Sequence, residues 1–139
     1  MKGRLMALDY GSKRIGVALS DPLRVLARGW GVVPRDPEGE AHFAAIAAII
    51  AEEAVTGLVL GLPRNADGSE GEMVELVRAF GSRLAELTGL ELAYCDESFS
   101  SLEADEILRQ KHRDPKKRKA ERDVVAAQII LRHHLDFAR

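Results

Sequence analysis

The chain has a single cysteine, no long apolar run and almost no net charge. The first two shortages argue against an internal disulfide and a membrane span. Cys95 cannot form an internal disulfide and is expected to be a small core residue of a buried strand. The first residues run directly into a strand pattern without a signal-peptide cleavage site, and no apolar stretch approaches the roughly 18 residues of a membrane span. We therefore expect a soluble, cytoplasmic protein with no membrane partner, in which residues 1–139 form a single domain.

The net charge of −2, taken alone, argues weakly against a nucleic-acid partner, but the charge is unevenly distributed. Residues 109–122 contain eight Lys or Arg and two acids, a net +6 that leaves −8 for the rest of the chain. Such a run is typical of a flexible arm that neutralises phosphates, although a solvated loop without a partner has the same composition. The basic residues that we expect to contact nucleic acid here are Lys116, Lys117, Arg118, Lys119 and Arg122.

The N-terminal part of the chain predicts three antiparallel strands. An apolar run ends at Leu8, Gly11 permits a tight turn, and residues 15–19 form an apolar returning segment, which together predict a hairpin. Residues 24–33 predict a third strand that extends this hairpin.

The remainder predicts alternating helices and strands. Asp36 followed by Pro37 predicts the start of one helix, and Ser69 with Glu72 has the spacing of a capping box for the next. Short apolar runs at residues 57–61 and 90–95 predict central parallel strands. The expected helices cover residues 36–54, 69–87, 100–108 and 120–137. The fold class is therefore α/β, a mixed five-stranded sheet of three antiparallel strands and then parallel strands, flanked by helices.

Three carboxylates lie where an α/β sheet of this kind forms its sites, beyond the carboxyl ends of the strands. Asp9 follows the first strand, Glu97 follows the fifth, and Asp123 lies on the last helix, on the same face as Ala126 and Ala127. Taken singly, Asp9 is explained by turn chemistry and Asp123 by a favourable position in the first helical turn. Together the three predict a site for divalent cations.

The surroundings of these carboxylates favour Mg²⁺ or Mn²⁺ over zinc, because no suitably spaced cysteine or histidine accompanies them. His133 and His134 are adjacent and lack the spacing of a helical metal site. A pair of such ions about 4 Å apart can activate water and stabilise the departing oxygen of a phosphodiester. Further phosphate contacts are expected from Lys13, Arg14 and Arg64.

Four motifs, in order along nearly the whole chain, resemble the YqgF (RuvX) family. They are residues 8–18 (LDYGSKRIGVA), residues 61–71 (GLPRNADGSEG), the pair at 96–97, and the segment from Asp123 to Leu131. The resemblance implies a ribonuclease-H-like fold and a metal-dependent nuclease, which either matures the 5′ end of pre-16S rRNA or resolves Holliday junctions. It assigns metal binding and catalysis to Asp9, Glu97 and Asp123. Ser98 stands where the family usually has an arginine, so a substrate-clamping role does not transfer to that position.

Two other function classes are compatible with parts of the sequence. Phosphotransferases of the actin and sugar-kinase type also carry an Asp before a glycine-containing turn in their first strand, but they need two lobes to enclose a nucleotide. A non-catalytic nucleic-acid binder would use the basic run and keep the acids for structure. The fold alone does not decide between structured RNA and branched DNA as the substrate. The sequence also leaves open whether the chain forms a homodimer.

Overall fold

A five-stranded mixed sheet is the centre of the fold. The computed structural model describes residues 3–63, 71–96 and 115–137, and for residues 115–120 the backbone only. The strands are β1 (Arg4–Tyr10), β2 (Arg14–Ser20), β3 (Ala27–Pro34), β4 (Val55–Leu62) and β5 (Glu91–Asp96), in the order β3-β2-β1-β4-β5. β1, β2 and β3 pair antiparallel, whereas β4 runs parallel to β1 and β5 parallel to β4. The predicted mixed sheet is therefore confirmed, but the strand predicted at residues 90–95 is not central: β5 lies at the edge of the sheet, and Cys95 on it is only partly buried.

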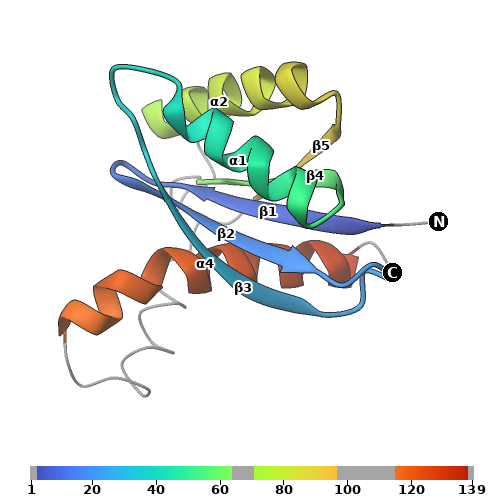
Figure 1. Ribbon diagram of the computed structural model, residues 1–139. Helices are drawn as coiled ribbons and strands as arrows, with labels where there is room; N and C mark the ends of the chain where they lie inside the picture. The colour runs from blue at the N-terminus through green and yellow to red at the C-terminus, as the bar shows by residue number, and fades with distance from the viewer. Residues whose placement is uncertain (1–2, 64–70, 97–114, 138–139) are drawn as a thin grey trace.

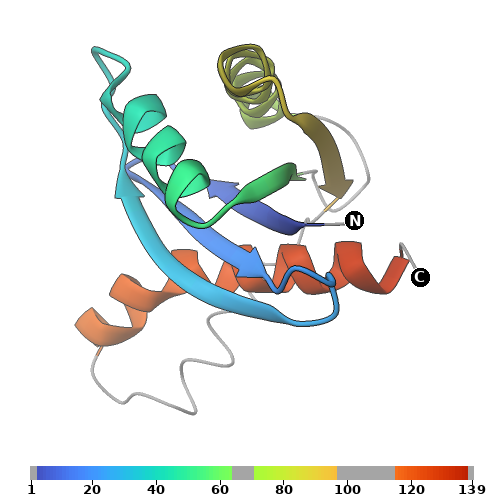
Figure 2. The same cartoon turned by 45° about the vertical axis from the view of Figure 1, so that its right-hand side comes forward.

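Helices cover both faces of this sheet. α1 (Ala41–Glu52) and α2 (Glu72–Thr88) lie on one face, and α4 (Pro115–Phe137) crosses the other face along β1, β2 and β3 (Figures 1 and 2). Successive side chains of β1 point to opposite faces, so Met6 and Leu8 pack under α1 and α2 while Leu5 and Ala7 pack against α4. No helix in the described ranges is long and apolar enough to span a membrane.

Two helices begin later than predicted. The Asp36 carboxylate does not cap α1; it accepts the N–H of Glu38 at 3.2 Å and the N–H of Ala41 at 3.4 Å, and so closes a turn before the helix begins at Ala41. The N-cap of α2 is Gly71, not the predicted Ser69, so the first helical residue is Glu72.

The third strand begins at Ala27 rather than at Arg24, because the preceding segment is held as a loop by Asp21. The Asp21 carboxylate accepts the N–H groups of Leu23, Val25 and Leu26 at 3.2, 2.8 and 2.7 Å. These bonds occupy backbone donors that a strand would have paired with β2.

The last helix begins at Pro115, five residues earlier than the predicted start at Ala120. Proline is well tolerated in a first helical turn, where its missing N–H has no intrahelical partner to lose. The basic residues from 116 to 122 therefore belong to helical backbone, and the prediction of a flexible arm is wrong for this part of the run. The predicted helix over residues 100–108 and the basic residues 109–113 lie outside the described residues.

Candidate functional site

Asp9 lies near the carboxyl end of β1, on the face of the sheet that α4 covers. It continues the alternation of Leu5 and Ala7, whose side chains pack against that helix. No residue that the structure describes donates a hydrogen bond to its carboxylate. The pKa of Asp9 is raised from 3.8 to about 6, mainly by burial and then by the negative charge of Asp123, while the positive charge of Arg122 opposes this shift. A cation beside this carboxylate would therefore stabilise its charged form.

Asp123 reaches the same place from α4 because the helix backbone lies directly on β2. Gly16 of β2 is the partner of Asp9 in the β1–β2 pair, and a Cβ at Gly16 would collide with the backbone carbonyl oxygen of Asp123. Ala126 and Ala127, one turn further along α4, are completely buried and permit the same close approach. The absence of a side chain at Gly16 thus lets two carboxylates from distant parts of the sequence come together.

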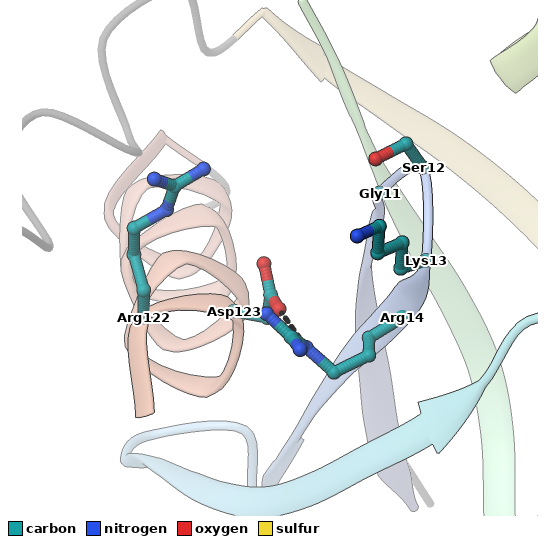
Figure 3. A pocket seen from close by; sticks show the side chains of 6 residues that line it. All are labelled: Gly11, Ser12, Lys13, Arg14, Arg122 and Asp123. Atoms are coloured by element: carbon teal, nitrogen blue, oxygen red, sulfur yellow. Dashed lines mark hydrogen bonds and ion pairs between the residues drawn. The ribbon is translucent and has the colours of Figure 1, made fainter. Parts of the chain in front are cut away.

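A cavity of about 200 Å³ opens beside Asp123, between the β1–β2 turn and α4 (Figure 3). Arg14 enters it from the start of β2 and donates its Nε–H to Asp123 Oδ2 at 2.9 Å. The side chains of Arg14 and Asp123 are 34% and 13% exposed. Lys13 on the turn and Arg122 on the helix are exposed on either side of the cavity (Figure 3). The cavity thus places a carboxylate between cationic side chains, an arrangement suited to a metal ion and a phosphate.

The turn that lines this cavity is held by Arg35, which the sequence analysis did not single out. The Arg35 backbone N–H donates to the Lys13 carbonyl oxygen at 2.9 Å, and its Nη1 donates to the Gly11 carbonyl oxygen at 3.2 Å. Its guanidinium also lies over the Tyr10 ring, 4.6 Å from the ring centroid. All these partners come from the β1–β2 hairpin, so no local pattern around Arg35 signals its role.

The other predicted site residues are less fully described. Glu97 and Arg64 lie outside the described residues, as do the side chains of Lys116, Lys117, Arg118 and Lys119 on the first turns of α4. Among the residues that are described, no group of three His, Cys, Asp or Glu side chains could hold a metal ion. The donor set formed by Asp9 and Asp123 is purely carboxylate, which fits Mg²⁺ or Mn²⁺ and does not fit zinc.

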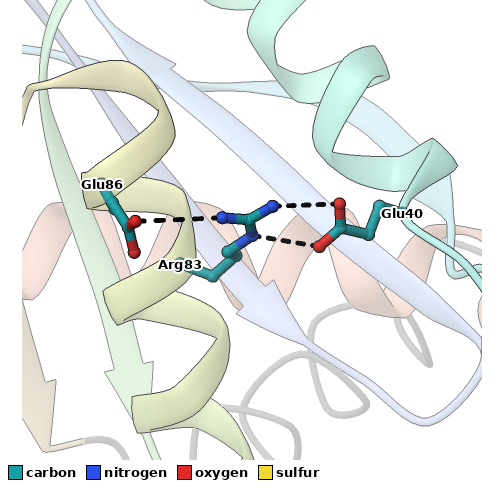
Figure 4. Close-up of polar contacts among 3 residues, drawn as sticks. All are labelled: Glu40, Arg83 and Glu86. Atoms are coloured by element: carbon teal, nitrogen blue, oxygen red, sulfur yellow. Dashed lines mark hydrogen bonds and ion pairs between the residues drawn. The ribbon is translucent and has the colours of Figure 1, made fainter.

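A charged cluster on the opposite face of the sheet provides a contrast with this site. Arg83 of α2 donates Nε–H and Nη2–H to the two carboxylate oxygens of Glu40 at 3.0 and 3.1 Å, and Glu86 lies 4.0 Å from its Nη1 (Figure 4). The hydrogen bonds from Arg83 lower the pKa of Glu40. These side chains are 40 to 75% exposed, so solvent screens the ion pairs and their contribution to stability is small. They are exposed pairs on the surface of the molecule.

Comparisons with known proteins identify the family of this chain. A family model for RuvX, described as Holliday junction resolvase, matches residues 3–137. Two curated relatives named "Putative pre-16S rRNA nuclease", from Streptococcus sanguinis and Agathobacter rectalis, are each 40% identical to this chain. Each alignment covers 96% of this chain, with 97% and 95% of the relatives.

A solved structure supports the fold independently of sequence identity. The structure of T. thermophilus RuvC in complex with a Holliday junction substrate has a TM-score of 0.55 and 13% identity, and the match covers 97% of this chain and 95% of that one. At this identity the likeness concerns the fold alone, and it confirms the predicted ribonuclease-H-like architecture. By its family match and its relatives of 40% identity, the chain belongs to the RuvX family of nucleases.

Proposed function

We propose that this chain is a metal-dependent nuclease that hydrolyses phosphodiester bonds in structured nucleic acid, and that its substrate is the 5′ end of pre-16S rRNA. The observation that carries the proposal is the electrostatic interaction of Asp9 with Asp123, which itself lines a cavity between cationic side chains. The substrate is supported by the names of the relatives from Streptococcus sanguinis and Agathobacter rectalis.

Asp9, Asp123 and Glu97 are the residues that would hold Mg²⁺ or Mn²⁺. Glu97 follows Asp96, the last residue of β5, and β5 runs parallel to β4, which itself pairs parallel with β1. Asp9 is half-buried and lacks a hydrogen-bond donor among the described residues, so its carboxylate is suited to a cation. A bound ion of this kind activates water and stabilises the departing oxygen of the cleaved ester.

The cationic residues around the cavity would bind the nucleic-acid backbone. Lys13 and Arg122 are exposed on either side of it, where a phosphate could reach both. The basic residues Lys116, Lys117, Arg118 and Lys119 precede Asp123 on the same helix, within roughly 10 Å along its axis at 1.5 Å per residue. We propose that these residues, together with Arg64, follow the backbone that leads into the cavity.

Resolution of Holliday junctions is the second candidate function. It is favoured by the description of the matching family model, and it would use the same carboxylates and the same basic residues. The two candidates differ in the shape of nucleic acid that they accept, so a direct comparison of cleavage rates distinguishes them.

The experiment compares wild type with Asp9→Asn and Asp123→Asn on a pre-16S rRNA 5′ leader and on a four-way DNA junction, each with Mg²⁺ or Mn²⁺. Because each variant removes one ligand charge, we expect cleavage of the preferred substrate to fall at least about 100-fold, while nucleic-acid affinity is nearly unchanged. Asp136→Asn is the matched control, because Asp136 is an exposed carboxylate near the other end of α4. Full cleavage by Asp9→Asn would exclude Asp9 as a ligand, and faster cleavage of the junction would replace the RNA substrate.

A further inference from the structure

Arg14 binds a carboxylate in this structure, although its sequence context predicted a phosphate contact. Its Nε–H donates to Asp123 Oδ2 at 2.9 Å. No other hydrogen bond of its guanidinium is made within the described residues, so the N–H groups of Nη1 and Nη2 are unused there. The side chain is 34% exposed and lines the cavity next to Lys13. One guanidinium therefore has access both to Asp123 and to a phosphate that enters the cavity.

Arg14 and a divalent cation compete for Asp123. The guanidinium is permanently charged, and it occupies one oxygen of a carboxylate that is only 13% exposed. A second positive charge brought to the same carboxylate is repelled by the first, and solvent screens this repulsion less than it would at the surface. Arg14 thus opposes cation binding for as long as it stays on Asp123.

We propose that Arg14 couples cation binding to nucleic-acid binding. Without nucleic acid, Arg14 holds Asp123 and weakens its affinity for the cation. A backbone phosphate in the cavity draws the guanidinium away, because a guanidinium binds phosphate oxygens in bidentate fashion and more strongly than through a single N–H group. Nucleic acid then strengthens cation binding, and by reciprocity the cation strengthens nucleic-acid binding by the same factor. This inference rests on the proposed function, since it takes Asp123 as a metal ligand.

The test measures the Mn²⁺ affinity of the full chain by electron paramagnetic resonance of free Mn²⁺. Each affinity is measured with and without a 2′-O-methyl copy of the RNA leader, and gel electrophoresis of the same samples checks that this copy stays uncut. Arg14→Gln is expected to raise the Mn²⁺ affinity of the free protein about 10-fold, equivalent to about 1.4 kcal/mol. The RNA is expected to raise the Mn²⁺ affinity of wild type by a similar factor and that of Arg14→Gln by less than about 2-fold.

Lys13→Gln is the matched control. It removes the same charge from the neighbouring position of the same cavity, but Lys13 makes no bond to Asp123 in the structure. Because Lys13 is itself proposed to bind the RNA backbone, this comparison uses RNA concentrations that saturate each variant. Under that condition Lys13→Gln should change the Mn²⁺ affinity of the free protein by less than about 3-fold and leave the effect of bound RNA on that affinity in place. An equal response of Lys13→Gln and Arg14→Gln would mean that only the general charge of the cavity matters, and would overturn the proposal.

Arg14→Lys provides a second variant that keeps a positive charge and is suitable if Arg14→Gln fails to fold. A lysine ammonium can remain on Asp123, but it cannot bind phosphate in bidentate fashion. We expect a Mn²⁺ affinity close to wild type without RNA and a smaller gain on adding RNA; an undiminished gain would overturn the proposal. If Arg14→Gln binds Mn²⁺ with the same affinity as wild type, the proposed coupling is refuted and the proposed function is not affected. A complete lack of Mn²⁺ binding by wild type would refute the proposed function as well.

Discussion

Replacing Gly16 with alanine tests the close contact on which the site depends. The added Cβ would collide with the backbone carbonyl oxygen of Asp123, and α4 cannot easily yield because Ala127 and Leu131 of the same helix are completely buried against the sheet. A backbone atom cannot rotate away as a side-chain methyl can. The perturbation must therefore shift the helix, the strand or both.

The size of the effect follows from two opposing contributions. Inserting a methyl group into a well-packed core costs about 1–3 kcal/mol, and contact with backbone places Gly16→Ala in the upper half of that range. Alanine also reduces the conformational entropy of the unfolded chain, which stabilises the folded state by about 0.4–1 kcal/mol. The net loss is about 2 kcal/mol, a substantial part of the roughly 5–15 kcal/mol that holds a domain folded. For a chain of this length that loss lowers Tm by about 6–8 °C.

Urea unfolding followed by circular dichroism and by the fluorescence of Trp30, the only tryptophan, measures this loss. We expect a lower midpoint with an unchanged m-value, because the surface exposed on unfolding is the same. Gly29→Ala is the control on β3, since its Cβ would lie 2.6 Å from Val124 Cγ1, a side-chain methyl of the same helix that can rotate. Its cost should be below about 1 kcal/mol. Equal stability of Gly16→Ala and wild type would refute the account of how α4 is seated.

Three further predictions concern separate features. Burial lowers the pKa of His42, whose Nδ1 accepts the Asp36 N–H, from its ordinary 6.5. The unfolded chain therefore binds more protons, and stability is lost as pH falls below about 6.5, by at most about 1.4 kcal/mol per pH unit. Urea unfolding of wild type and His42→Asn across pH 4 to 8 should show a shallower dependence in the variant, and parallel curves would refute this. Neutralising Lys117 and Arg118 should reduce the slope of log affinity for RNA against log salt concentration by roughly one unit per lost phosphate contact. An unchanged slope would mean that the RNA does not contact these two residues. Arg35→Gln should weaken RNA binding without disturbing the packing of α4, because the turn that carries Lys13 loses the hydrogen bond from Arg35 to the Gly11 carbonyl oxygen. An RNA affinity equal to that of wild type would show that the turn keeps its shape without Arg35.

Local signals in the sequence were sufficient to predict which described segments form helices or strands and in what order they follow one another. Alternating and continuous apolar runs depend only on neighbouring residues, so the hairpin, the parallel strands and the helix carrying Asp123 could all be predicted. Element ends were less predictable, because they depend on which backbone groups a single side chain captures. Asp36 and Asp21 each bind backbone N–H groups that a propensity argument assigned to a helix or a strand.

The site illustrates the same division. The sequence alone was enough to select Asp9 and Asp123 as unusual carboxylates, because each interrupts an apolar pattern. It could not show that Arg14 pairs with Asp123, since these residues are 109 positions apart and the pairing exists only once α4 lies on β2. Nor could it show that Gly16 matters for its missing side chain and not for a turn. Short-range periodicity thus determined which residues face the core, whereas packing between α4 and the sheet decided which charges meet, because such contacts depend on the distance between folded elements.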